Sequence, residues 1–231
     1  NYPQRLLFSE KYSFAHPIQA ALAHRTELGD FLWGNTLYTM WQCDRIMGNG
    51  KWRTECAYNP CAGGLSHNFM TALLFTDSSI TRVRATGQVL TYHKDLDRFG
   101  GYDTMEGTLE FSDGKRLNWL VCLAVKESNS PFGHRTVTHT FQFEHGSLAY
   151  GPTPQSDQLI VAGRGIAITA EPNAEKWSDY NLDILYGKMH MDLLAALTTG
   201  KSPLHNIFHG INVAYASCIA FESAKRGGEW I

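Results

Sequence analysis

MHMDLLAALTTGKSPLHNIFHGINVAYASCIAFESAKRGGEWI, residues 189–231, decides the architecture expected for this chain. Apolar residues recur at helical spacing before Gly200 and again after Pro203, and such a Gly–Pro interval between two periodic runs is typical of a turn. Gly227 and Gly228 follow the second run and are expected to end it, because glycine commonly stops a helix. The segment therefore predicts two helices joined by a turn at 200–203, with a short apolar end.

The middle of the chain predicts a series of strands. Segments 104–111 and 116–124 flank Ser112-Asp113-Gly114, which is a strong hairpin signal. Segment 135–143 alternates as RTVTHTFQF, and His139 and His145 are expected to be exposed strand or turn residues. Polar residues on one side of these strands favour a sheet with one covered and one open face. The open face is predicted to carry Trp119, Val121 and Leu123 or their alternates. Further strands are expected at 80–92, 148–150 and 158–170.

The first third of the chain predicts a mixture of elements. Segment 5–12 is expected to be a strand, 16–24 a helix that ends at Gly29, and 31–41 a strand with a bulge at Gly34. A Gly-Gly turn at 63–68 is expected to lead into an apolar helix at 69–75. The predicted fold class is α+β, an open-faced, mostly antiparallel sheet with helices packed on one face. No linker divides the chain, so residues 1–231 are predicted to form a single domain.

Composition excludes several classes of function. The 231 residues carry a net charge of −2 and no cluster of Lys or Arg, so no nucleic-acid surface is expected. No apolar run is long enough to span a membrane. Five scattered cysteines without C-x-x-C favour reduced thiols, a cytoplasmic location and no metal site. Because the chain opens on Asn1, a further segment is expected ahead of it in the natural protein.

Several short segments occur in the order found in one oxidoreductase family. In that family an A-I-x-x-G-x-x-P turn and a helix ending S-A-x-x-G close the chain, as the last 43 residues quoted above do here. Further matches are ELGD at 27–30, AGGL at 62–65, VRATG at 83–87 and GTLEFSDG at 107–114. The order of these segments resembles the C-terminal domain of Gfo/Idh/MocA oxidoreductases from end to end.

The resemblance implies a substrate-binding and oligomerisation domain of an NAD(P)-dependent oxidoreductase acting on a sugar, cyclitol or related polyol. It implies a homo-oligomer formed through the open sheet face. The family binds NAD or NADP with a Rossmann half, which is absent from this chain, so a Rossmann-containing partner or a missing segment is implied. The sequence contains no G-x-G-x-x-G, and no cofactor-binding residue is assigned.

The resemblance also implies where the site lies. Active members carry an Asp and a His four residues apart in the helix after the Gly-Gly loop, and histidine suits proton transfer near neutral pH. Here His67 stands where the Asp is expected and Thr71 where the His is expected; a slip of a few residues makes His67 the family histidine. His67 is the predicted catalytic residue, and the alternative is a histidine that caps the helix. The predicted substrate-binding residues are Tyr12, His16, Asn68 and Thr71.

Two other functions remain open at this point. The altered Asp–His pair is compatible with a redox-silent sugar-binding or assembly subunit. It is also compatible with a cofactor-free lyase or isomerase that uses His67 as a base on a keto-sugar. His205 and His209 are four residues apart, but no third ligand accompanies them, and we interpret them as structural.

Overall fold

The computed structural model describes residues 11–14, 16–40, 61–90, 101–124, 135–152, 157–163, 166–170 and 182–231. Its helical elements are η2 (Lys11–Phe14), α1 (His16–Ala23), α2 (Arg25–Leu28), α4 (Cys61–Thr76), α6 (Leu182–Thr199) and α7 (Ile207–Lys225). Its strands are β1 (Phe31–Met40), β2 (Ile80–Gln88), β3 (Thr104–Phe111), β4 (Arg116–Cys122), β5 (Arg135–Phe143), β6 (Gly146–Pro152), β7 (Asp157–Gly163) and β8 (Ile166–Ala170).

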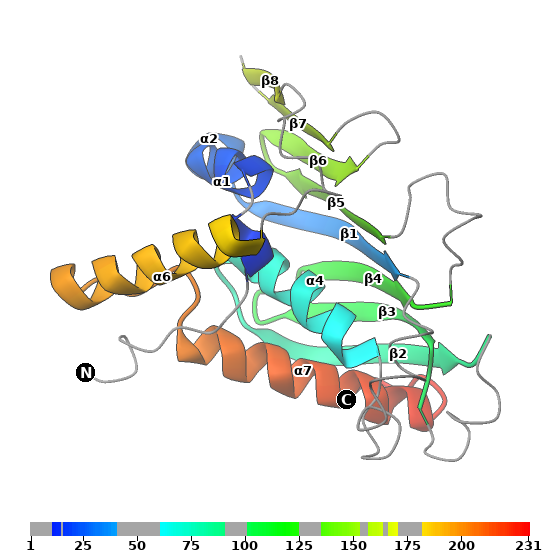
Figure 1. The fold of residues 1–231 in the computed structure, drawn as a ribbon. Helices are drawn as coiled ribbons and strands as arrows, with labels where there is room; N and C mark the ends of the chain where they lie inside the picture. Colours follow the sequence, from blue (N-terminus) through cyan, green and yellow to red (C-terminus); the bar gives the residue numbers. More distant parts are fainter. Residues whose placement is uncertain are drawn as a thin grey trace.

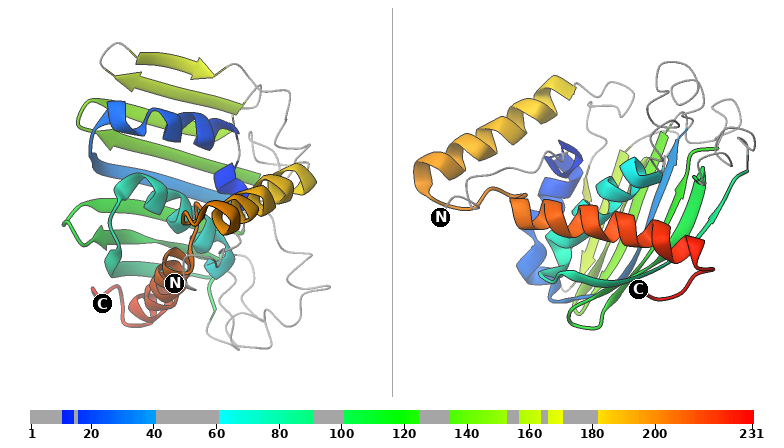
Figure 2. Two further views of the ribbon diagram at one scale, coloured as in Figure 1. Left: turned by 90° about the vertical axis from the view of Figure 1, so that its left-hand side faces the viewer. Right: turned by 90° about the horizontal axis from the view of Figure 1, so that it is seen from below.

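The strands form one sheet of eight in the order β2-β3-β4-β1-β5-β6-β7-β8. The first strand in the chain lies near the centre of this sheet and pairs parallel with β4, while the other neighbouring pairs are antiparallel. Helices α1, α4 and α7 lie on one side of the sheet (Figure 1; Figure 2). The predicted fold class, an open-faced and mostly antiparallel α+β sheet, is confirmed.

The core lies between the sheet and these helices. On β4 the residues Leu117, Trp119 and Val121 are buried, and the indole of Trp119 meets the ring of Phe69 on α4 edge-on, with ring centroids 5.5 Å apart. These residues therefore face the helices, and the alternating positions, such as Asn118, face the open side. The sequence left open whether Trp119, Val121 and Leu123 or the residues that alternate with them face the open side. The structure shows that the alternating residues do.

The helix α4 begins earlier than the sequence predicted. Its first residue is Cys61, so the predicted loop at 63–68 is helical. Gly64 explains the close packing of this helix on the sheet, because a Cβ there would lie 2.8 Å from Val121 Cγ1 and 3.0 Å from Tyr38 Cδ1. Gly64 therefore allows the helix to pack closely on the sheet, and the prediction of a turn at 63–68 is wrong.

Three other local predictions need correction. Tyr12 lies in the 3-10 helix η2, which packs against α4 and α6, so the strand predicted for 5–12 does not extend to it, while residues 5–10 lie outside the described part of the structure. The bulge of β1 lies between Phe31 and Trp33, not at Gly34. The glycine at position 34 makes room for the ring of Phe141 on β5, because a Cβ at Gly34 would lie 2.5 Å from Phe141 Cδ1. His139 is buried, as described below, because it shares the inward parity of Phe141 and Phe143.

The chain end covers the edge strand β2. Val83 and Ile231 exchange both backbone N–H···O bonds, at 2.9 and 3.1 Å. Ser223 Oγ on α7 accepts a hydrogen bond of 2.9 Å from the Ala85 N–H. An uncovered edge strand is a template for unwanted pairing, and this arrangement blocks it. Among the described residues no helix has the length and apolar character needed to cross a membrane.

We expect Gly64→Ala to lower the free energy of unfolding by about 2 kcal/mol, because the added methyl group has no room against Val121 and Tyr38. Gly187→Ala on α6 is the matched control. A Cβ at that helical glycine meets nothing within 4 Å, so this change should be neutral or stabilise by up to about 1 kcal/mol. Urea unfolding of both variants checks this. Equal stability of the two would contradict the packing argument.

Candidate functional site

His67 lies on the α4 face that looks onto β1. Its imidazole is half-buried and stacks on the buried ring of Tyr38, with centroids 5.9 Å apart and planes inclined by 26°. Gly64, one turn earlier, lets α4 approach Tyr38 closely enough for this stack. The arrangement holds the imidazole at a set position while part of it remains accessible, which is what a proton-transferring residue needs.

The two other α4 candidates are buried. Thr71 is 2% exposed, and its hydroxyl donates a 3.1 Å hydrogen bond to the His67 carbonyl one turn back, so it is engaged by its own helix. Asn68 is fully buried, and neither its Oδ1 nor its Nδ2 has a hydrogen-bond partner among the described residues. A buried amide without partners costs stability and is unusual outside functional sites.

The remaining predicted residues lie on neighbouring elements. Tyr12 is in η2 and His16 is the first residue of α1; their side chains lie outside the described part of the structure. The helix η2 packs against α1, α4 and α6. The backbone therefore brings the segments that carry Tyr12 and His16 next to the helix that carries His67 and Asn68.

A buried polar pair, not predicted from the sequence, lies on the side of the sheet that faces the helices. Thr36 on β1 and His139 on β5 are register partners, 3% and 2% exposed, and Thr36 Oγ1 lies 2.8 Å from His139 Nδ1. Thr36 is two residues from Tyr38 and so shares its face of the strand. The alternation of 135–143 contained the signal, since His139 has the same parity as Phe141 and Phe143.

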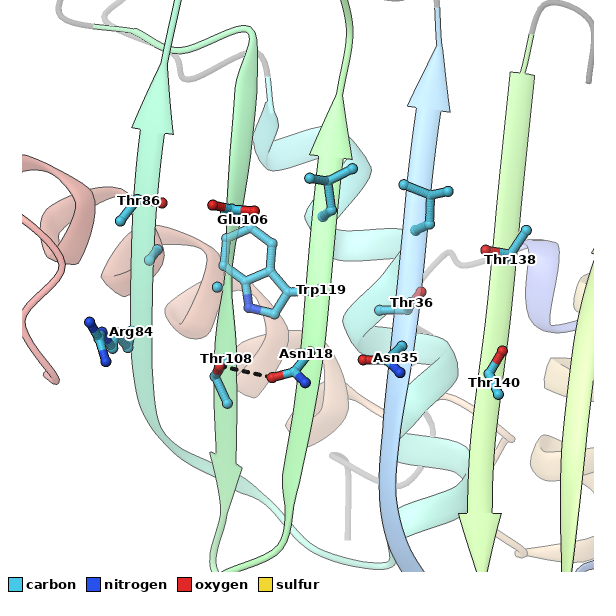
Figure 3. A pocket seen from close by; sticks show the side chains of 14 residues that line it. Asn35, Thr36, Arg84, Thr86, Glu106, Thr108, Asn118, Trp119, Thr138 and Thr140 are labelled. Atoms are coloured by element: carbon cyan, nitrogen blue, oxygen red, sulfur yellow. Dashed lines mark hydrogen bonds between the residues drawn. The ribbon is translucent and has the colours of Figure 1, made fainter. Parts of the chain in front are cut away.

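The open face of the sheet carries a groove of about 520 Å³ across β2, β3, β4, β1 and β5 (Figure 3). Half of its fourteen lining residues carry hydroxyl or amide side chains, and Thr108 Oγ1 donates to Asn118 Oδ1 at 3.0 Å. Arg84 and Glu106 contribute opposite charges, and neither makes an ion pair within the described residues. The other lining residues are Asn35, Thr36, Leu37, Ala85, Thr86, Gly107, Trp119, Leu120, Thr138 and Thr140.

One end of the open face is rich in tryptophan and arginine. The guanidinium groups of Arg82 and Arg116 lie 5.1 and 5.4 Å from the ring centroid of Trp230, and both pair with the Glu110 carboxylate, at 3.4 and 2.9 Å. Trp33 is the register partner of Arg116 and is 46% exposed. Trp and Arg are enriched where protein interfaces concentrate their binding energy.

Other titratable clusters have structural explanations. Burial, followed by the charges of Asp103 and Cys122, raises the pKa of the Cys61 thiol, which disfavours the reactive thiolate. His205 and His209 do meet, with ring centroids 6.0 Å apart, and burial lowers the pKa of His209. The described residues contain no group of three side chains suited to hold a metal ion.

The described residues contain neither of two common glycine-rich motifs that bind nucleotide phosphates. Gly200-Lys201-Ser202 has the ending of a phosphate-binding P-loop, but Ala195 stands where that motif requires glycine, and the segment joins two helices. In this sheet the parallel pair β1 and β4 is not connected by a glycine-rich strand-to-helix turn within the described ranges.

Comparisons with known proteins show the fold. No protein-family model and no curated protein sequence matches the chain. Among solved structures it is similar to an oxidoreductase from Agrobacterium radiobacter in complex with NAD+, L-tartaric acid and magnesium, at 16% identity and a TM-score of 0.72. That match covers 98% of this chain and 64% of the other.

Two further structures have the same relationship. An aldose-aldose oxidoreductase from Caulobacter crescentus, complexed with glycerol, matches at 18% identity and a TM-score of 0.70, over 98% of this chain and 63% of that one. An inositol dehydrogenase homolog from Azotobacter vinelandii, with NADH and myo-inositol, matches at 16% identity and a TM-score of 0.68, over 97% and 63%. The chain thus spans less than two thirds of their length and has the fold of the C-terminal domain of Gfo/Idh/MocA oxidoreductases.

The unpartnered amide of Asn68 makes a prediction. Asn68→Leu should raise the free energy of unfolding by about 1 kcal/mol, because it removes a buried polar group without breaking a hydrogen bond. Asn212→Leu is the matched control. The Asn212 amide bonds both the N–H and the carbonyl of Ile80, at 2.9 and 3.0 Å, so its loss should cost about 2 kcal/mol.

Thermal unfolding of the two variants measures the difference. If Asn68 also contacts a polyol, the stabilised variant should lose polyol binding in calorimetry, which is the usual trade between stability and function. A loss of stability in Asn68→Leu would show that its amide is satisfied in solution.

Proposed function

We propose that these 231 residues form a single unit, the substrate-binding and oligomerisation domain of an NAD(P)-dependent oxidoreductase that acts on a sugar, cyclitol or related polyol. The observation that carries the proposal is the arrangement on α4: a half-buried His67 held on Tyr38, next to a buried Asn68 whose amide lacks partners. The fold and the polyol and NAD complexes of the similar structures support it.

In this proposal the chain supplies polyol binding and proton transfer. Oxidation of a carbinol releases the hydroxyl proton, and the His67 imidazole accepts it. The stack on Tyr38 holds the imidazole in place. The Asn68 amide has both a donor and an acceptor for hydroxyl groups, and because it is buried in this structure, the helix and its neighbours must shift for it to meet a polyol. NAD or NADP is the hydride acceptor and is held by a separate nucleotide-binding unit, in the same polypeptide or in a partner.

The test is turnover by the natural full-length protein with NAD(P) and a panel of aldoses and cyclitols. His67→Ala should lower kcat by about 100-fold or more, since general base catalysis contributes at least that much. His145→Ala, at an exposed turn between β5 and β6, should leave kcat unchanged. Unchanged turnover in His67→Ala would remove His67 from the proton-transfer role.

Two alternatives have distinct outcomes in the same experiment. The altered Asp–His pair favours a redox-silent sugar-binding subunit, for which calorimetry would detect polyol binding while no nucleotide is reduced. A cofactor-free lyase or isomerase would exchange deuterium at the carbon next to a ketone, and His67→Ala would abolish the exchange. We also propose a reducing, cytoplasmic setting, which the five scattered cysteines of the sequence favour.

The open face is the proposed homo-oligomer interface. Its tryptophan–arginine end supplies the residue types of interface hot spots, and the groove next to it carries Arg84 and Glu106 without ion-pair partners. In a two-fold interface each residue meets its partner reciprocally, so one copy's Arg84 could pair with Glu106 of the other. The two unpaired charges are thereby matched without any additional protein.

We expect the protein to be at least a dimer at micromolar concentration by light scattering. Trp33→Glu should weaken the dimer by about 100-fold, because it replaces an aromatic anchor with a smaller, strongly hydrated side chain. Tyr215→Glu is the control, since that residue is 64% exposed on α7, away from the open face. A monomeric wild-type protein would overturn the proposed interface.

A further inference from the structure

Exposed apolar side chains are concentrated on the last two helices. Seven of the ten large apolar side chains that are exposed in the described residues belong to α6 and α7. On α6, Met191, Leu194 and Leu197 are 63%, 51% and 47% exposed. Burial of each such side chain is worth about 1.5–3 kcal/mol, so a helix that leaves three of them in water is expected to have a further partner.

These three residues define one face of α6. At about 100° per residue they lie within roughly 120° of the helix circumference. The buried residues Leu185, Met189 and Ala196 lie on the opposite side by the same count. The helix therefore has an inner apolar face that is covered and an outer apolar face, Met191–Leu194–Leu197, that is not.

The inner face is attached to the body through a small cluster. Leu185 and Met189 pack with Phe14 of η2 and with Leu204, in a cluster separate from the main core. The Asp192 carboxylate accepts a 2.8 Å hydrogen bond from the Leu204 N–H. Apart from this attachment, α6 projects away from the sheet (Figure 1; Figure 2). Nothing in the described part of the chain covers its outer face.

We infer that this outer face of α6 is the docking surface for the nucleotide-binding unit, an inference that rests on the proposed function. The helix η2 contacts both α6 and α4, so α6 is linked through η2 to the helix that carries His67. A domain-sized unit seated on the outer face has to extend around α6 to reach His67, because hydride transfer requires the reacting atoms to approach to about 3–3.5 Å. Similar structures contain NAD+ or NADH and extend well beyond the part matched here.

A second copy of the chain is the other possible occupant, and the structure favours a different place for it. The tryptophan–arginine end and the opposite charges of Arg84 and Glu106 lie on the open face, on the opposite side of the sheet from α4 and α7. The α6 outer face has no comparable complementary charges among Met191, Leu194 and Leu197. The two surfaces are therefore assigned to two different partners.

The first test is hydroxyl-radical footprinting of the natural full-length protein, purified with any partner it retains and saturated with NADH. Met191, Leu194 and Leu197 should be modified several-fold less than their exposure in this structure implies. Leu90 is the reference, since its exposure of 51% equals that of Leu194 and it lies two residues after β2, away from α6. If Leu194 is modified as much as Leu90 in protein that turns over, the docking surface is overturned.

The second test is a pair of matched variants, Leu194→Glu and Leu90→Glu. Leu194→Glu should lower kcat/KM by about tenfold or more through loss of docking, while polyol affinity in calorimetry stays within about twofold. Leu90→Glu should leave both unchanged. Normal kcat/KM in Leu194→Glu would contradict the inference and leave the proposed function intact. Absence of any nucleotide-dependent turnover would instead remove the proposed function, and protection that depends on protein concentration would assign the face to a second copy.

Discussion

The contact of α4 with the sheet at Gly64 is the constraint on which the candidate site depends. A side chain at this position would collide with Val121 and Tyr38, so glycine sets the distance between the helix and the strands. That distance places His67 over the Tyr38 ring and buries Asn68. A helix that packed even slightly farther away would leave His67 without its stacking partner and would hydrate the Asn68 amide.

The two sides of the sheet differ in chemistry because strand residues alternate. The inner side is aromatic and aliphatic, and its few polar groups, such as Thr36 and His139, are paired with each other. The outer side carries hydroxyl, amide and charged groups in a groove. The tryptophan–arginine end, formed by Trp33, Arg82, Arg116 and Trp230, lies next to this groove. Catalytic candidates gather on the helix side and interface candidates on the open side, so one sheet can serve both without competition.

The expected elements were largely found because their signals are local. Ser112-Asp113-Gly114 predicted the β3–β4 hairpin, and Gly29 ended the first helical region as expected, with a φ of 78°. Errors arose where glycine and histidine have more than one use. Gly64 was interpreted as a turn residue but allows close packing inside a helix, and His139 was assigned to solvent although its strand parity places it in the core.

The sequence by itself determined most of the order of elements, the presence of one covered and one open face of the sheet, and the family resemblance, because periodicity, turn residues and short motifs are encoded locally. Tertiary structure alone decided the parallel pairing of β1 with β4, the Thr36–His139 pair and the stack of His67 on Tyr38. These contacts join residues that are distant in the chain, and their geometry follows from strand register and helix–sheet distance. The uncovered outer face of α6 likewise became visible only once its inner face was seen packed against η2.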